Sequence, residues 1–245
     1  MIQADSRNGS PIWAILPVKR VDQAKQRLSN ALSSFERQGL FRHMLSDVLD
    51  AIGGARFLDG LMVITCDPEF QELAARRGAR VSDTAADLGQ SAAVAAAAAQ
   101  LSAEGVNNII TLPGDVPLLT AREIDSVCCG LRAAPALTIV PSRDNTGTNS
   151  IACSPPGAIP FMFGERSFAR HMHAARDNGI PTQVLRLPGM GLDIDVEADL
   201  VELLDHDVTT ATQRFLISSG IAGRLVPRPY VPKEPRATAA TGRVA

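Results

Sequence analysis

Short runs of β-branched and apolar residues alternate with segments of helical periodicity from residue 12 to about residue 205. This alternation is typical of an α/β domain. The run from Ile12 to Leu16, which Pro17 ends, predicts a buried first strand. Further strands are predicted over residues 61–65, 108–112, 137–140, 149–153 and 183–187, with a short strand over 192–194.

The predicted helices have start and stop signals of their own. Ser33 and Glu36 have capping-box spacing, and apolar residues then recur at helical intervals to Ile52. Asp67 followed by proline is typical of a helix start. Helices are therefore predicted over residues 33–52, 68–77, from Asp87 or a neighbour to 105, from Thr120 to about 133, 167–178 and about 197–205.

The chain of 245 residues is long enough for one large domain. We assign residues 11–220 to this domain and residues 1–10 to a flexible N-terminus. Residues 221–245 are rich in proline, arginine and alanine and lack periodicity, so we predict a disordered tail there.

Composition narrows the possible partners. The chain is 45% hydrophobic and 20% charged, which is typical of a globular protein. A net charge of -2 and 4% aromatic residues argue against nucleic-acid binding. Four cysteines without a Cys-x-x-Cys pair, and no apolar run of membrane length, predict a cytoplasmic protein with no membrane partner.

A basic segment follows the first predicted strand. Lys19, Arg20, Lys25 and Arg27 all lie within nine residues. Ligands of an α/β sheet bind beyond the carboxyl ends of its strands, where such charges can hold a triphosphate. The alternative is a solvated basic start of a helix.

Acidic residues follow two other predicted strands. Asp115 lies in a Pro-Gly-Asp turn after the strand over 108–112, where it is either a metal ligand or a turn aspartate. Asp193 and Asp195 are two residues apart, so on a strand both carboxylates face one side. Such oxygen ligands suit Mg²⁺, although Asp195 could instead cap the next helix.

Other chemistries lack their motifs. The chain has neither GxxxxGK[ST] nor a GxGxxG that opens the first helix, so no P-loop or dinucleotide site is supported. The histidines lack zinc-site spacing. We interpret His171 and His173 as surface or partly buried residues.

Six pieces of the chain occur in the order of a known family and cover roughly residues 12 to 205. They read ILPVKRVDQAKQRLS, FERQGLFRHMLSDVL, LPGDVPLL, PSRDNTGTNSI, FMFGERSFARH and GLDIDVEADL. In these pieces the chain resembles the CofC-like guanylyltransferases. That resemblance implies a single three-layer α/β/α domain with a mostly parallel mixed sheet, the nucleotide-diphospho-sugar transferase (GT-A-like, Rossmann-like) fold.

The resemblance also implies an activity. Members of this family transfer GMP from GTP to 2-phospho-L-lactate, phosphoenolpyruvate or 3-phospho-D-glycerate during biosynthesis of the factor-420 deazaflavin coenzyme, and pyrophosphate is released. GTP, a small phosphorylated acid and Mg²⁺ are thus the expected ligands, and the next enzyme of that pathway is a possible partner. The rival interpretations are transfer of a nucleotide to a sugar phosphate or molybdopterin, and nucleotide binding without turnover.

Carried over residue by residue, the resemblance gives three groups of site residues. The GTP group comprises Lys19, Lys25 and Arg27 on the phosphates, with Pro17, Gly89, Gly114 and Asp115 also at the nucleotide. The metal group comprises Asp115, Asp193 and Asp195. The acid group comprises Thr148, Gly164 and Ser167, where Ser167 is expected to cap a helix whose free amides face the anion.

Two segments depart from the family pattern. Residues 88–91 read Leu-Gly-Gln-Ser where the family often has Gly-Leu-Asn. The turn over residues 144–147 reads Asp-Asn-Thr-Gly in place of the commoner Asp-Gly-Gly. The first change concerns recognition of the base, and the second concerns the acid pocket.

Overall fold

A computed structural model describes residues 10–23, 25–131 and 134–225 of the chain. Their centre is a 7-stranded sheet in the order β3-β2-β1-β4-β6-β5-β7. All pairings are parallel except those of β6 with β4 and with β5. The strands are β1 (Ile12–Pro17), β2 (Gly60–Ile64), β3 (Arg80–Ser82), β4 (Asn108–Thr111), β5 (Ala136–Pro141), β6 (Thr148–Ser154) and β7 (Thr182–Val184).

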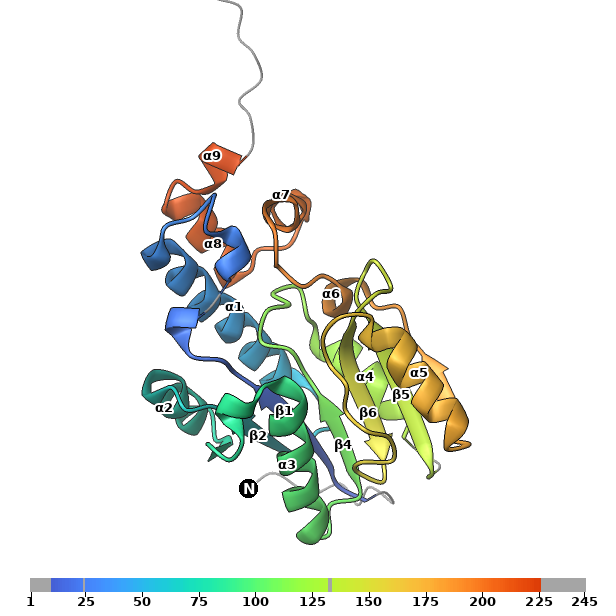
Figure 1. Cartoon of the computed structure of the whole chain (residues 1–245). Helices are drawn as coiled ribbons and strands as arrows, with labels where there is room; N and C mark the ends of the chain where they lie inside the picture. Colours follow the sequence, from blue (N-terminus) through green and yellow to red (C-terminus); the bar gives the residue numbers. More distant parts are fainter. Residues whose placement is uncertain (1–9, 24, 132–133, 226–245) are drawn as a thin grey trace, which may run out of the picture.

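Helices cover both faces of this sheet (Figure 1). They are α1 (Ser34–Gly54), α2 (Pro68–Arg76), α3 (Gln90–Ala103), α4 (Ala121–Cys129), α5 (Ser167–Asp177), α6 (Pro188–Gly191), α7 (Glu197–Asp205), α8 (Ala211–Ser218) and α9 (Ala222–Leu225). Short 3-10 helices lie at η1 (Val21–Gln23), η2 (Gln26–Leu28) and η3 (Ala86–Leu88). The three-layer α/β/α fold with a mostly parallel mixed sheet is confirmed.

Alternation along the strands separates two hydrophobic clusters. Ala14 and Leu16 of β1 belong to the cluster that contains the buried residues of α1 and α4, whereas Ile15 belongs to the cluster that contains those of α3. Successive side chains of a strand point to opposite faces, so β1 contributes to the core on both sides of the sheet.

The direction of β6 matters for the site. Because β6 runs antiparallel to β4, its first residues lie at the edge of the sheet where β1 and β4 end. Segments from distant parts of the sequence therefore meet at one edge: the loops after β1 and β4, the start of β6 and the segment after α6.

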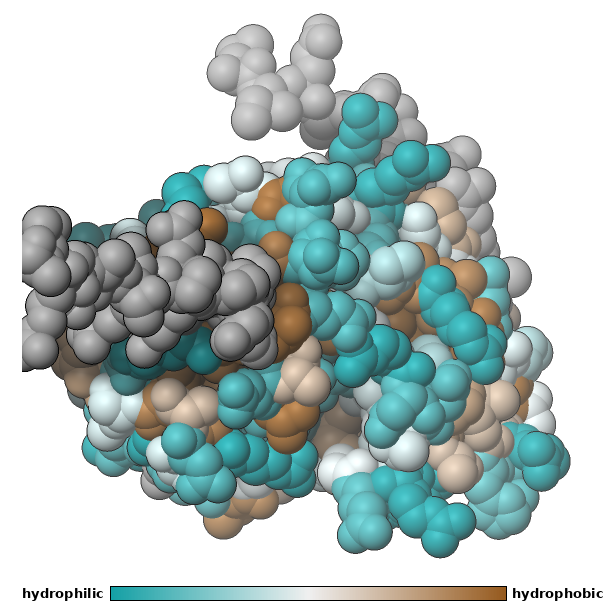
Figure 2. All heavy atoms as spheres, turned by 90° about the horizontal axis from the view of Figure 1, so that it is seen from above, coloured by the Kyte–Doolittle hydropathy of each residue, from teal (hydrophilic) through white to brown (hydrophobic). Residues whose placement is uncertain are grey.

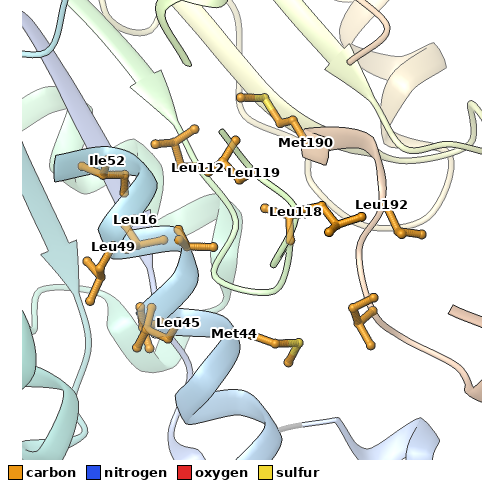
Figure 3. Close-up of a cluster of buried hydrophobic side chains, with 14 of the residues drawn as sticks. Leu16, Met44, Leu45, Leu49, Ile52, Leu112, Leu118, Leu119, Met190 and Leu192 are labelled. Carbon is orange, nitrogen blue, oxygen red and sulfur yellow. The ribbon is translucent and has the colours of Figure 1, made fainter. Parts of the chain in front are cut away.

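Apolar residues anchor the loops at this edge. Leu118 and Leu119 follow Asp115, and Met190 and Leu192 precede Asp193; all four belong to the cluster that also contains α1. Figure 3 draws them in the same buried cluster as Leu112 and as Met44 and Leu45 of α1. The acidic residues thus lie on loops whose neighbouring side chains are fixed in the core, which restricts how far the carboxylates can move.

Several predicted boundaries differ from the structure. Residues 192–194 form no strand; after α6 this segment has no regular secondary structure, and the Ile194 amide donates to the Asp115 carbonyl at 3.1 Å. The alanine-rich helix begins at Gln90 after Gly89, while Asp87 lies in η3. The helix that starts after Thr120 ends at Cys129, before the predicted end at 133, which lies outside the described residues.

The sequence did not lead us to predict β3, α8 or α9. Ile221 and Leu225 are buried in the cluster around α1, so residues 221–225 are packed against the domain although we assigned them to the tail. The domain thus extends at least to residue 225, whereas residues 1–9 and 226–245 of the predicted termini lie outside the described residues. Within the described ranges, no helix combines the length and the apolar character that crossing a membrane requires.

Candidate active site

Lys25 is the centre of the basic segment. Its backbone has φ 50 and ψ 44, a left-handed conformation that is uncommon outside glycine and often found at functional sites. The side chain is only 5% exposed, and Nζ lies 2.5 Å from Asp115 Oδ2 and 2.9 Å from Asp195 Oδ1. The basic segment is therefore more than a solvated helix start, because one of its lysines is buried between two carboxylates.

The other cations of the basic segment lie outside the buried contacts of Lys25 with Asp115 and Asp195. Arg27 is 76% exposed, and its Nη1 lies 3.2 Å from Asp195 Oδ2. Lys19 is also exposed, and its charge acts on Asp195. The basic segment thus presents both buried and exposed positive charge beyond the end of β1.

The charges of this group are strongly coupled. Burial alone would lower the pKa of Lys25, but the carboxylates of Asp115 and Asp195 outweigh it and raise that pKa. Burial likewise acts to raise the pKa of Asp195, while the charge and hydrogen bond of Lys25 lower it below its usual value. Lys25 and Asp195 are thus held in their charged forms.

Asp193 is in a different electrostatic position. Burial and the charge of Asp115 raise its pKa above the usual value. Its Oδ1 accepts a hydrogen bond from Asn149 Nδ2 at 3.2 Å, and the same amide group donates to the Met190 carbonyl at 3.0 Å. Asp193 therefore has an amide partner but no cation of its own among the described residues.

The segment that carries the two acidic residues is fixed from the other side by α7. Asp199 Oδ2 accepts hydrogen bonds from the backbone amides of Asp195 and Val196, each at 2.8 Å. Arg143 Nη2 lies 3.3 Å from Asp199 Oδ1. Asp199, and not Asp195, bonds to the free amides before α7, so the alternative of Asp195 as a helix cap is wrong.

The charges of Asp115 and Asp195 both raise the pKa of Asp193, so the three carboxylates lie near one another. Two of them, Asp115 and Asp195, are paired with Lys25. In the part of the chain that the structure describes, no group of three or more histidine, cysteine, aspartate or glutamate side chains has the spacing of a metal site. The carboxylates fit Mg²⁺ in donor chemistry, since all are oxygen ligands with unbalanced negative charge at Asp193. The metal assignment stays a prediction.

The predicted acid group lies beside this cluster, at the start of β6. The Thr148 amide donates to Ser167 Oγ at 2.9 Å, and Asn149, the next residue, contacts Asp193. Gly164 has φ +114, a conformation that side chains rarely adopt, and its carbonyl accepts from the Ser167 amide at 3.1 Å. The structure thus brings Thr148, Gly164 and Ser167 together next to the acidic residues.

Two expectations for this part of the site need correction. Ser167 is the first residue of α5 and Arg166 precedes it as the cap residue, without a side-chain cap, so Ser167 bonds to Thr148 rather than capping the helix. His171 is completely buried, whereas we expected a surface or partly buried residue. Its ring links Thr148 to the backbone of Met162, a contact that helical position alone does not reveal.

The turn before β6 is held by its own aspartate. Asp144 accepts hydrogen bonds from Ser142 Oγ at 2.6 Å, from the Thr146 amide at 2.9 Å and from Thr146 Oγ1 at 2.7 Å. These bonds lower the pKa of Asp144 to about 2, and the bond from Ser142 has the largest effect. The Phe168 amide donates to the Thr146 carbonyl at 3.2 Å, which connects the turn to α5.

The loop that we predicted to lie at the nucleotide contacts the segment before Gly164 through Ser91. Ser91 Oγ, in the first turn of α3, accepts from the Phe163 amide at 2.9 Å, and Phe163 directly precedes Gly164. Gly89 is exposed with φ +92, while Gly114 is buried near Leu45. Pro17 ends β1. Seen from above in Figure 2, hydrophilic residues cover much of this end of the molecule, with hydrophobic ones between them.

Comparison with known proteins places the chain in a family. The family model "Guanylyl transferase CofC like" matches residues 12–227. Phosphoenolpyruvate guanylyltransferase of Sphaerobacter thermophilus is 37% identical over 193 residues, which are 79% of this chain and 92% of that protein. 2-phospho-L-lactate guanylyltransferase of Methanothermobacter thermautotrophicus is 31% identical over 203 residues, covering 83% of this chain and 88% of that protein.

A third relative is named for another acid. 3-phospho-D-glycerate guanylyltransferase of Colwellia psychrerythraea is 32% identical over 197 residues, which cover 80% of this chain and 93% of that protein. Among solved structures, a protein of Desulfovibrio desulfuricans G20 assigned to the nucleotide-diphospho-sugar transferases has a TM-score of 0.71 at 14% identity, covering 89% of this chain and 99% of that one. The chain therefore belongs to the CofC-like guanylyltransferase family and has the nucleotide-diphospho-sugar transferase fold.

Proposed function

We propose that this protein transfers GMP from GTP to a phosphorylated three-carbon acid, with Mg²⁺ as cofactor and pyrophosphate as the second product. The observation that carries this proposal is the junction of two groups at one sheet edge. Lys25 with Asp115 and Asp195 forms a charged group suited to a nucleoside triphosphate, and Thr148 with Ser167 forms a polar group beside it. Asn149 joins them through Asp193.

In the proposed reaction, a phosphate oxygen of the acid attacks the α-phosphorus of GTP. The bond from that phosphorus to the bridging oxygen of the β-phosphate breaks, and pyrophosphate leaves with the electron pair. Lys19, Lys25 and Arg27 would bind the triphosphate, and the Thr148 and Ser167 hydroxyls would bind the acid. Catalysis then follows from the positioning of two anions, without a covalent enzyme intermediate.

Asp115, Asp193 and Asp195 are the residues proposed to hold Mg²⁺. When bound, the metal would neutralise charge on the phosphates as it develops. Lys25 contacts two of these carboxylates, so we expect its flexible side chain to turn towards the triphosphate when they bind a metal. Lys25 would then neutralise the carboxylates in the free protein and the triphosphate in the complex.

We propose further that this reaction serves the biosynthesis of the deazaflavin coenzyme, as the resemblance to the family implies. Their names include three acids, so the names alone do not select one for this chain. The direct test is to incubate the protein with GTP, Mg²⁺ and each acid in turn. Pyrophosphate release and a GMP-linked product of the correct mass are expected with at least one acid.

The same assay separates the proposal from its rivals. A nucleotide-binding protein without turnover would bind GTP but release no pyrophosphate with any acid. An enzyme for a sugar phosphate or molybdopterin would release pyrophosphate only with that acceptor. Either outcome would reject the proposed acid substrate.

Arg27→Ala tests binding of the triphosphate separately from the stability of the fold. Arg27 is 76% exposed, so its ion pair with Asp195 should contribute less than about 1 kcal/mol to folding. A charge-assisted contact to phosphate is worth more, and its loss should lower kcat/KM for GTP roughly ten- to a hundredfold. Arg214→Ala, at an exposed arginine on α8, is the matched control. Unchanged kinetics in Arg27→Ala would remove Arg27 from the nucleotide site.

Thr148→Val and Ser167→Ala test the acid side. Both hydroxyls lie where we expect the carboxylate or phosphate of the acid, so both substitutions should change the ratio of kcat/KM values among the three acids. The KM for GTP should change much less. Competition between acid pairs measures these ratios directly. Equal ratios in the wild type and both variants would show that other residues select the acid, and the wall formed by α3 would be the next candidate.

A further inference from the structure

The contacts of His171 define its protonation. Its Nε2 lies 2.7 Å from the backbone nitrogen of Met162, which can only donate, so Nε2 is the unprotonated acceptor. The ring is completely buried, and burial, with a smaller effect of the Arg170 charge, lowers its pKa to about 4. A neutral imidazole with an accepting Nε2 carries its proton on Nδ1.

That proton fixes the role of Thr148. His171 Nδ1 lies 3.0 Å from Thr148 Oγ1, so the ring donates and the hydroxyl oxygen accepts. The Thr148 hydroxyl keeps its own proton for another acceptor. Ser167 repeats this pattern, because its Oγ accepts from the Thr148 amide at 2.9 Å and its hydroxyl proton also remains to be donated.

Each of these two neighbouring hydroxyls accepts a hydrogen bond from a protein donor, so each can donate its own proton to a bound anion. An anionic oxygen accepts hydrogen bonds and cannot donate, so it complements hydroxyls that have proton donors behind them. The second contact of His171 acts on the same pocket. By holding the amide of Met162, it fixes the backbone two residues before Gly164.

We propose that His171 is a positioning residue for the acid substrate, which orients the Thr148 hydroxyl to donate to an anionic oxygen of that substrate and holds the loop that leads to Gly164. This inference rests on the proposed function. The contrasting interpretation is a buried histidine that only completes the packing between α5 and β6.

Two substitutions separate the two contacts of the ring. Glutamine at position 171 can place an oxygen near the position of Nε2 and accept from Met162, but it loses the donor to Thr148. Asparagine can place its amide nitrogen near the position of Nδ1 and donate to Thr148, but it does not reach Met162. His173→Gln is the matched control, because His173 is an exposed histidine on the same helix that pairs with Asp177.

The experiment measures KM for the acid and KM for GTP in these variants and in Thr148→Val. We expect His171→Gln to raise KM for the acid about tenfold or more, the loss expected for a hydrogen bond to a charged group, with KM for GTP nearly unchanged. His171→Asn should raise it less, and His173→Gln should match the wild type. In the Thr148→Val background, His171→Gln should have little further effect, because the hydroxyl that it orients is already absent.

A measurement on the unmodified protein covers the case in which the variants fail to fold. Long-range ¹H–¹⁵N spectra at neutral pH should show His171 as the neutral tautomer with its proton on Nδ1. The other tautomer, or a protonated ring, would overturn the proposal. So would equal increases in both KM values, or additive effects of His171→Gln and Thr148→Val. If the wild type instead transfers GMP to none of the acids, the proposed function fails, whatever tautomer the spectra show.

Discussion

Alanine at Asp115, Asp193 or Asp195 should abolish GMP transfer while the protein remains folded. Each of these carboxylates is at least partly exposed at the sheet edge, and the apolar residues around them anchor the loops. Charge neutralisation by a metal is worth several kcal/mol in the transition state, so each loss should lower kcat by roughly a hundred- to a thousandfold or more. Steady-state rates with varied Mg²⁺ measure this effect.

The strongest form of this prediction concerns Asp193→Asn. The Asp193 carboxylate is repelled by Asp115 and Asp195, and its only hydrogen bond among the described side chains comes from Asn149. Asparagine keeps the size and can still accept from Asn149, but it removes the repelling charge. We therefore expect Asp193→Asn to be inactive and at least as stable as the wild type, with an equal or higher Tm.

Glu197→Ala is the control for both measurements. Glu197 is an exposed acid two residues after Asp195, in the first turn of α7, so its loss removes the same charge from the same surface. Its activity should stay close to that of the wild type. Near-normal rates in all three aspartate variants at limiting Mg²⁺ would reject the metal assignment. A clear loss of stability in Asp193→Asn would show that its carboxylate has a structural role.

Local signals in the sequence predicted most elements of the fold. The capping boxes at Ser33 and Thr120 and the Asp67-Pro68 start all mark real helices. Thr210 and Gln213 form the same box before α8, so that helix could also have been found from its spacing. These signals work because capping bonds join residues only two or three positions apart.

Pairing between distant segments was harder to predict. The run over residues 192–194 has the composition of a strand, but among the described residues its one backbone bond to the loop after β4 is that of Ile194 with Asp115. The three-residue β3 is too short to show a period. Asp193 and Asp195 nevertheless lie near Asp115, because the burial of Met190 and Leu192 in the same cluster as Leu118 and Leu119 brings them there and not because of strand alternation.

The candidate site could likewise be predicted only in part from the sequence. Its charged residues could be predicted from strand ends and from the family resemblance. Their partners could not, because Asn149, His171 and Ser91 reach the site through contacts across 44, 23 and 72 positions of the chain. Only the fold shows that His171 faces Thr148 while His173, two positions further along α5, faces solvent.

Replacing Lys25 should have the largest combined effect on activity and stability in the basic segment. Its ammonium group is buried against Asp115 and Asp195, and its loss leaves two neighbouring carboxylates without their shared cation. These carboxylates are 27% and 39% exposed, so solvent screens part of the repulsion and we expect a loss of only roughly 1 to 3 kcal/mol in the free energy of unfolding. Denaturant titration measures this loss.

Activity should fall further than stability. Lys25 is proposed to bind the triphosphate as well as to orient the carboxylates, so kcat/KM for GTP should fall at least about a hundredfold. Lys25→Arg should not rescue the rate, because a planar guanidinium does not fit a buried position that holds a point charge. Arg20→Ala is the matched control, since Arg20 lies in the same segment, is half-exposed and pairs with Asp22.

Because the backbone of Lys25 is left-handed, substitutions at this position can separate the effect of the turn conformation from the effect of the charge. Asparagine tolerates a positive φ far better than lysine or alanine does, so Lys25→Asn should relieve backbone strain that Lys25→Ala retains. We expect Lys25→Asn to be the more stable of the two and both to be equally inactive. If Lys25→Asn instead recovered most of the activity, the conformation of the turn would be the requirement at this position, and the charge of Lys25 would have no part in binding GTP.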